Sequence, residues 1–224
     1  MGLLQRAVET YDNHRRLVGQ IRDGHAVLAP ISHIVTAAGL EITLDPEGHF
    51  VNASNVSVSE LKIIIPATEG SAGRTSAPCA HPLCEQLGYL LPQNEVKYSL
   101  YVEQLTQWEQ SAHTHPKLTA ILRYIKGGTL QEDLISAGVL KLNRAGKPED
   151  DKKLVRWRVL GEGTQECWQD RELFEAFAKF YATITKSPTQ LCMITGEEMA
   201  VAEQHPKGII PINENNHDIK NIIL

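Results

Sequence analysis

The densest run of potential metal ligands in the sequence is Cys79-Ala80-His81-Pro82-Leu83-Cys84. Thiolates and imidazoles are the ligands that zinc prefers, so a small zinc-dependent hydrolase built on Cys79, His81 and Cys84 is one hypothesis. A zinc site usually takes its four ligands from two such groups, and the second group is missing. The alternative is a pair of half-buried thiols at the start of a helix, with Pro82 in its first turn. The alternative is favoured, so the sequence predicts no bound metal and no cofactor.

No catalytic constellation is visible in the sequence. A nucleophilic cysteine needs a base and a group that orients the base, and neither lies near Cys167 or Cys192 in the chain. The sequence also lacks the glycine motifs that cradle the phosphates of nucleotides. We therefore expect a protein that is not an enzyme, with no catalytic residues.

Positive charge is concentrated in one stretch, residues 141–158. Seven cations stand there against three acids, which gives a local charge of 7 − 3, or +4. Because side chains alternate along a strand, Arg156 and Arg158 are expected on one face and Trp157 on the other. Such a stripe could follow a phosphate backbone, or it could protect an exposed sheet edge. The candidate DNA-binding residues of this stripe are Lys152, Lys153, Arg156 and Arg158.

A second candidate lies in residues 67–78, which show no periodicity and contain two glycines. This pattern predicts an unusually long loop, and long loops within a compact domain are commonly functional. Arg74, Thr75 and Ser76 place one cation and two hydroxyl groups on it, so the loop could approach phosphates or the edges of a DNA groove.

The periodicity of the sequence predicts an α+β fold. An amphipathic helix is expected over residues 2–21, against a small antiparallel sheet formed by a hairpin around Asp45-Pro46-Glu47-Gly48 and by a third strand at 62–65. A helical middle follows, and then a second small β element at 154–160 leads into an aromatic-rich helix. The apolar stripe of that helix indicates core, and the separation of helices from strands argues against a parallel doubly wound sheet.

Length and composition limit the class of protein. The 224 residues carry a formal net charge of −5 and are 42% hydrophobic, which argues against a disordered chain. We expect two parts, residues 1–112 and 113–224, or one continuous domain. Four scattered cysteines indicate a reducing compartment, and no stretch has the apolar length of a signal peptide core or a membrane span. The expected location is the cytoplasm.

Read in order, several features resemble one family, the Csd-type large subunit of the type I-C CRISPR Cascade complex. The resemblance spans essentially the whole chain. Its most specific part is a Cys-x-x-Thr-Gly element followed about ten residues on by His-Pro-Lys. It rests on the Leu3-Leu4 helix with Tyr11, the 45–48 hairpin, Arg74-Thr75-Ser76 leading to Cys84 and Tyr89-Leu90-Leu91, Trp168 with Arg171, Cys192-Met193-Ile194-Thr195-Gly196-Glu197, and His205-Pro206-Lys207.

The resemblance implies a subunit that binds DNA without cutting it. In RNA-guided complexes the guide RNA reads the target by pairing, while the protein reads a short adjacent motif in duplex DNA. The implied partners are double-stranded target DNA, the CRISPR RNA ribonucleoprotein, other Cascade subunits and a recruited helicase-nuclease. The implied groove-entering element is the Arg74–Ser76 loop, and the implied backbone-tracking surface is the 141–158 stripe. A protein-protein assembly domain is the alternative without DNA contacts.

Two departures from the family pattern are visible. Ala77-Pro78 follows the Arg74 loop where the family usually has glycine, so the contacts of that loop are not fixed by the resemblance. After Lys207 the family continues into a long C-terminal region, whereas this chain ends at Leu224. The chain therefore resembles the N-terminal portion of a large subunit.

Overall fold

The hairpin around residues 45–48 forms where the sequence predicts it. The computed structural model describes residues 2–22, 25–75, 77–185, 188–192 and 196–200. In strand β2 (Leu40–Leu44) the residues Leu40, Ile42 and Leu44 are buried, and β3 (Phe50–Asn55) pairs with it antiparallel. The side chain of Asp45 accepts a hydrogen bond from the backbone of His49 at 2.8 Å and closes the turn. The period-two pattern and the turn residues therefore fix this hairpin locally.

The tip of the hairpin is docked on helix α5 (Pro116–Gly127). Gly48 has φ +85°, and a Cβ atom there would lie 2.5 Å from the carbonyl oxygen of Ala120. Arg123 Nη1 also donates to the carbonyl oxygen of Glu47 at 2.6 Å. Both the backbone conformation and the close approach require glycine at this position.

The strand at the end of the basic stretch, β5 (Val155–Val159), completes the sheet of the hairpin. It pairs parallel with β2, in the strand order β3-β2-β5, with Leu40 opposite Val155 and Leu44 opposite Val159. The α+β class is confirmed. Two details are wrong: the strand at 154–160 is not a separate second β element, and the third strand at 62–65 pairs with residues 33–37 and not with the hairpin. The chain between β2 and β5 includes β3 and the helical middle, and a connection of that length allows the parallel pairing.

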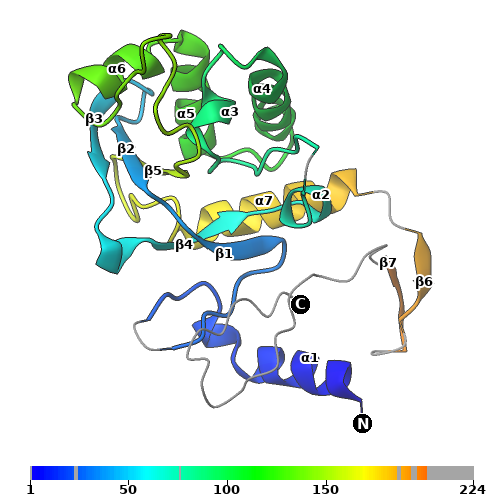
Figure 1. Cartoon of the computed structure of the whole chain (residues 1–224). Helices are drawn as coiled ribbons and strands as arrows, with labels where there is room; N and C mark the ends of the chain where they lie inside the picture. Colours follow the sequence, from blue (N-terminus) through cyan, green and yellow to red (C-terminus); the bar gives the residue numbers. More distant parts are fainter. Residues whose placement is uncertain (1, 23–24, 76, 186–187, 193–195, 201–224) are drawn as a thin grey trace.

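The helical middle is confirmed as a set of helices on one side of the sheet (Figure 1). It contains α3 (Leu87–Leu90), α4 (Glu95–Glu109), α5 and α6 (Leu130–Ser136). Helix α5 begins with Pro116 at its first turn, where a missing N–H costs nothing, and ends at Gly128 in the left-handed conformation. Sequence signals at both ends therefore set its length.

Helix α7 (Arg171–Ile184) buries the aromatic stripe that the sequence assigns to the core. Leu173, Phe174, Phe177 and Phe180 are buried, and the ring centroid of Trp108 lies 5.1 Å from that of Phe177. The helix also contacts the two-stranded sheet formed by β1 (His33–Ala37) and β4 (Lys62–Pro66). The contact is made by His33 and Phe174, whose ring centroids lie 4.8 Å apart. The prediction that this stripe is core is confirmed.

Two predicted boundaries differ in the structure. Residues 67–78 are not loop throughout, because Glu69–Ala72 form the short helix α2, whose N-cap Thr68 accepts from the backbone of Ser71 at 3.1 Å. At the N-terminus α1 spans Leu3–Asn13 and is followed by a 3-10 turn at Arg15–Leu17. None of the α1 side chains that the structure describes is buried, and Figure 1 shows this helix apart from the sheets.

The remaining described elements are short. A 3-10 turn at Val58–Glu60 precedes β4, and β6 (Thr189–Leu191) pairs with β7 (Glu198–Ala200) after α7. Residues from both sides of position 112 share one hydrophobic cluster, in which β2, α4, α5, β5 and α7 all take part. No helix in the part of the chain that is described is long and apolar enough to cross a bilayer.

Candidate nucleic-acid interface

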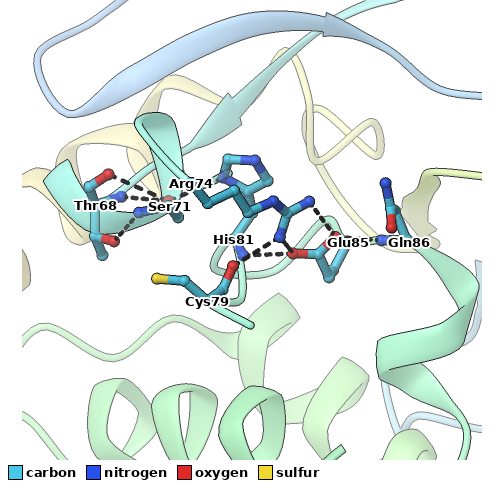
Figure 2. A network of polar contacts seen from close by, with 7 residues as sticks. All are labelled: Thr68, Ser71, Arg74, Cys79, His81, Glu85 and Gln86. Carbon is cyan, nitrogen blue, oxygen red and sulfur yellow. Dashed lines mark hydrogen bonds and ion pairs between the residues drawn. The ribbon is translucent and has the colours of Figure 1, made fainter. Parts of the chain in front are cut away.

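Arg74, the cation of the predicted DNA-contacting loop, is turned into the protein. Its Nη2 atom donates to Glu85 Oε1 at 2.9 Å, and its Nη1 atom donates both to Glu85 Oε2 and to the carbonyl oxygen of Cys79 (Figure 2). The guanidinium carbon also lies 5.3 Å from the centre of the Tyr89 ring. Burial lowers the pKa of Arg74, but the hydrogen bonds and charge of Glu85 outweigh this effect and raise it above its ordinary value. Arg74 therefore anchors the loop from inside.

Glu85 is the centre of this network and is completely buried. Besides Arg74, its carboxylate accepts hydrogen bonds from the backbone N–H groups of His81 and Gln86, each at 2.6 Å. A buried carboxylate is tolerated only when it is paired and hydrogen-bonded in this way. Of the other two predicted loop residues, Thr75 is exposed and Ser76 lies outside the described residues.

The hypothetical zinc ligands do not form a metal centre. His81 Nδ1 lies 2.9 Å from Ser71 Oγ, and burial lowers the pKa of His81 to about 4. Burial raises the pKa of the Cys84 thiol well above its ordinary value, which disfavours the thiolate that zinc requires. Within the ranges that the structure describes, no group of three metal-ligating side chains lies together. The zinc-dependent hydrolase hypothesis therefore has no site to support it.

Arg156 occupies a buried position on the outer face of β5. It is 5% exposed, and its Nη2 atom lies 2.6 Å from Glu41 Oε2 while its Nη1 atom donates to the carbonyl oxygen of Glu60 at 2.7 Å. The guanidinium also stacks over the Trp168 ring, with its carbon 4.0 Å from the ring centre. Its donors are used inside the protein, so this cation is not presented to solvent.

Arg158 shares the same carboxylate. Its Nε atom donates to Glu41 Oε1 at 2.8 Å, its Nη1 atom pairs with Glu166, and its guanidinium carbon is 5.5 Å from the Trp168 ring centre. Trp157 points the other way, into the core, and donates to the carbonyl oxygen of Leu83 at 2.8 Å. The period-two prediction for this strand is confirmed, with both arginines on one face.

The outer edge of β5 is not exposed. The backbone N–H of Val155 donates to the carbonyl oxygen of Glu85 at 2.9 Å, and that of Cys167 donates to the carbonyl oxygen of Trp157 at 3.1 Å. The interpretation of the arginines as protection for an open edge is therefore wrong. Instead, they form an ion-pair cluster with Glu41 and Glu166 that covers Trp168.

The lysines of the predicted interface differ from the arginines. Lys152 is exposed, and Lys153 is partly buried with its Nζ atom 3.0 Å from Asn55 Oδ1. Three further cations lie earlier in the stretch, and all three are exposed. Among the residues that the structure describes, none of the three has an ion-pair partner. These are Lys141, Arg144 and Lys147.

The acidic partners are what sequence reasoning missed. Glu41, Glu85 and Glu166 neutralise the three arginines that turn inward, Arg74, Arg156 and Arg158, yet Glu41 and Arg156 are separated by 115 positions. The available signal was the alternation of β2, which places Glu41 on the outer face between Leu40 and Ile42. The alternation predicts on which face of the sheet Glu41 lies, but it does not predict that Glu41 pairs with Arg156.

An open pocket of about 970 Å³ lies beside the N-terminal ends of α5 and α7. Its lysine, Lys117, is hydrogen-bonded to Asp170 and to the carbonyl oxygen of Thr164. Arg171 contributes a cation to the lining, and Glu162 and Glu172 contribute acids. The lining is therefore of mixed charge and does not extend the exposed cationic surface.

Comparison with known proteins gives one family. No curated protein matches the sequence. A family described as CRISPR-associated protein (Cas_Csd1) matches residues 8–223, which include the ion-pair networks around Glu85 and Glu41 as well as the exposed cations of 141–152. Because the match covers nearly the whole chain, the chain belongs to the Cas_Csd1 family of CRISPR-associated proteins.

Proposed function

We propose that this chain is a DNA-binding subunit of a CRISPR RNA-guided surveillance complex and that it breaks no bond itself. Membership of the Cas_Csd1 family implies antiviral defence as part of a Cas complex. Within such a complex the chain reads a short motif in duplex target DNA, helps to separate the strands, and provides a platform for a helicase-nuclease and the other Cascade subunits.

The observation that carries the proposal is the set of exposed cations in residues 141–152. Lys141, Arg144, Lys147 and Lys152 have no carboxylate partner among the described residues, whereas Arg156 and Arg158 of β5 do. An unpaired surface cation can release counterions from DNA when it meets a phosphate, and this gain is the main source of affinity for nucleic acid. Exposed Thr75 adds a hydroxyl group at the loop that Glu85 holds.

The chemistry of the two buried cysteines, Cys84 and Cys167, supports the non-catalytic part of the proposal. Burial raises the pKa of Cys167 to about 12 and also raises that of Cys84, so both thiols stay protonated. The thiolate is the nucleophilic form of cysteine, and buried protonated thiols are inert.

The first test measures binding of the full chain to a short fluorescent DNA duplex at several salt concentrations. We expect the affinity to fall steeply between about 50 and 200 mM salt, with a slope of about −0.9 for each phosphate contacted in a plot of log affinity against log salt. The Lys152→Glu variant is expected to bind more weakly than Lys126→Glu, a matched change at an exposed lysine at the end of α5. Affinity that does not depend on salt would overturn the proposal.

A second measurement addresses motif reading. Duplexes that differ only in a short randomised segment next to the target are sorted by their affinity for the full complex that contains this chain. We expect a small set of segments to be enriched, because motif reading needs contacts to base edges. Equal affinity for all segments would remove motif recognition from the proposed function.

A further inference from the structure

Residues 141–148, here named the basic turn, form a tightly bonded hairpin-like loop. The backbone N–H of Asn143 donates to the carbonyl oxygen of Lys147 at 2.8 Å, and that of Glu149 donates to the carbonyl oxygen of Lys141 at 3.0 Å. The side chain of Asn143 accepts from the backbone N–H groups of Ala145 and Lys147, at 2.9 and 3.1 Å. These hydrogen bonds join the two ends of the turn and hold its backbone in one conformation.

The base of the basic turn is attached to the core. Leu140 is buried, Leu142 packs against the main hydrophobic cluster, and Leu142 also forms a backbone bridge with Pro148. Gly146 has φ +74°, which glycine adopts without strain. The turn is therefore a rigid projection on a buried apolar base.

All the charge of the basic turn has one sign. Its charged residues are Lys141, Arg144 and Lys147, all exposed, and the first acid that follows is Glu149. No ion pair joins any of these three cations to another residue in the described part of the chain. Ala145 and Gly146 at the tip carry small side chains, so a ligand can come close to the backbone.

We infer that the basic turn is a preformed finger that contacts the phosphate backbone of a nucleic acid. The inference rests on the proposed function and names the element that supplies most of its electrostatic affinity. Because the internal hydrogen bonds hold the backbone of the turn before binding, little backbone conformational entropy is lost when its cations meet phosphates. Lysine and arginine donate to phosphate oxygens at any base sequence, so the finger positions the protein and does not read the motif.

The test compares two triple variants of the full chain with the same net charge. The finger variant carries Lys141→Gln, Arg144→Gln and Lys147→Gln, and the control carries Lys62→Gln, Lys126→Gln and Lys179→Gln at exposed lysines elsewhere. Each changes the formal net charge from −5 to −5 − 3, or −8. We expect the finger variant to bind at least about tenfold more weakly than the control and to lose about 2 to 3 units of salt slope.

A second pair of variants tests the preformed shape at constant charge. Gly146→Ala and Gly138→Ala both introduce a Cβ atom at positive φ, +74° and +72°, and in both cases nothing lies within 4 Å. The strain is therefore similar, but only Gly146 lies in the basic turn. We expect Gly146→Ala to weaken binding several-fold relative to Gly138→Ala, with both proteins folded by circular dichroism.

The outcomes separate this inference from the proposed function. If the unmodified chain shows no salt-dependent binding, the proposed function fails. If the unmodified chain binds but the two triple variants have equal affinity and equal salt slope on duplex DNA and on single-stranded RNA, the finger inference fails and the proposed function stands. A selective loss in the finger variant on either nucleic acid supports the inference and identifies which backbone it contacts.

Discussion

The arginines of β5 and the cations of the basic turn lie within one stretch of eighteen positions in the sequence, but they have opposite environments. Arg156 and Arg158 are ion-paired with Glu41 and stacked on Trp168, whereas Lys141, Arg144 and Lys147 project from a turn without carboxylate partners in the described structure. The local charge of +4 is therefore the sum of two groups of cations that lie in different environments. One group of cations stabilises the fold, and the other is available to a ligand.

The difference follows from the cost of burying charge. A guanidinium that leaves water must gain an acid and hydrogen bonds, and Glu41 provides both because it is the register partner of Arg156 in the β2–β5 pairing. A slip by one residue would turn both arginines toward the core and Trp157 toward the surface. The ion pairs thus favour a single register of the parallel strands. The cost of burying charge also explains the second network: the buried carboxylate of Glu85 is paired with Arg74, as Figure 2 shows.

The largest effect is expected from removing the carboxylate of Glu85, which is completely buried. Glu85→Ala leaves the Arg74 guanidinium and the backbone N–H groups of His81 and Gln86 without their acceptor. We expect the free energy of unfolding to decrease by about 3 to 5 kcal/mol, as for other buried pairs that lose one partner. Urea denaturation measures this free energy, and the variant Glu149→Ala, at an exposed glutamate, is the control. A loss below about 1 kcal/mol would class the pair with surface ion pairs.

Acid is expected to weaken the packed regions around His81 and His33 and not the basic turn, which contains no histidine. Burial lowers the pKa of His81 and of His33 to about 4 in the folded protein, from 6.5. Between pH 4 and pH 6.5 the unfolded chain binds more protons than the folded chain. The contribution of the two neutral histidines to the free energy of unfolding is therefore fully present above about pH 6.5 and is lost as the pH falls toward 4. Each histidine contributes a slope of at most about 1.4 kcal/mol per pH unit.

The variant His81→Asn tests this pH dependence. We expect unfolding free energies measured from pH 7 to 4 to show a smaller slope in the variant than in the unmodified chain. An unchanged slope would show that His81 is not held neutral in the folded state.

A smaller effect is expected from exchanging cations of equal charge in the two regions. Arg156→Lys keeps the charge but loses the contacts to Glu41 and Glu60 made through separate nitrogens, as well as the stacking on Trp168. We expect a loss of about 2 kcal/mol in the free energy of unfolding. The reverse exchange in the basic turn, Lys147→Arg, is expected to stay within about 0.5 kcal/mol of the unmodified chain. Equal effects at both positions would contradict the comparison.

Local patterns in the sequence predicted most of the fold. The alternation of Leu40, Ile42 and Leu44 with the turn at Asp45–Gly48 identified the hairpin, and helical spacing identified α4, α5 and α7. These elements follow from periods of two and 3.6 residues, which need no knowledge of distant partners. The strand β1 was not predicted because buried and exposed positions do not alternate along it, and helix α2 was not predicted because its four residues make only about one turn.

The candidate site was predicted only in part. The basic stretch was found because charge is visible in the sequence, and the exposed position of Thr75 and Lys152 agrees with a surface role. The inward orientation of Arg74 and Arg156 was not foreseen, because it depends on glutamates that are distant in the chain or hidden by folding. Ser76, Met193–Thr195 and His205-Pro206-Lys207, which carry part of the family resemblance, lie outside the described residues.

By itself the sequence determined most of the helices and strands, where the cations are concentrated and which family the chain resembles. Only the tertiary structure decided which of those cations are neutralised and which face the solvent. The physical reason is that burial is a property of packed elements: β2 and β5 meet through a long crossover, and that meeting brings Glu41 to Arg156 and Arg158. The basic turn stays exposed because its hydrogen bonds are satisfied within itself and only its apolar base is packed on the core.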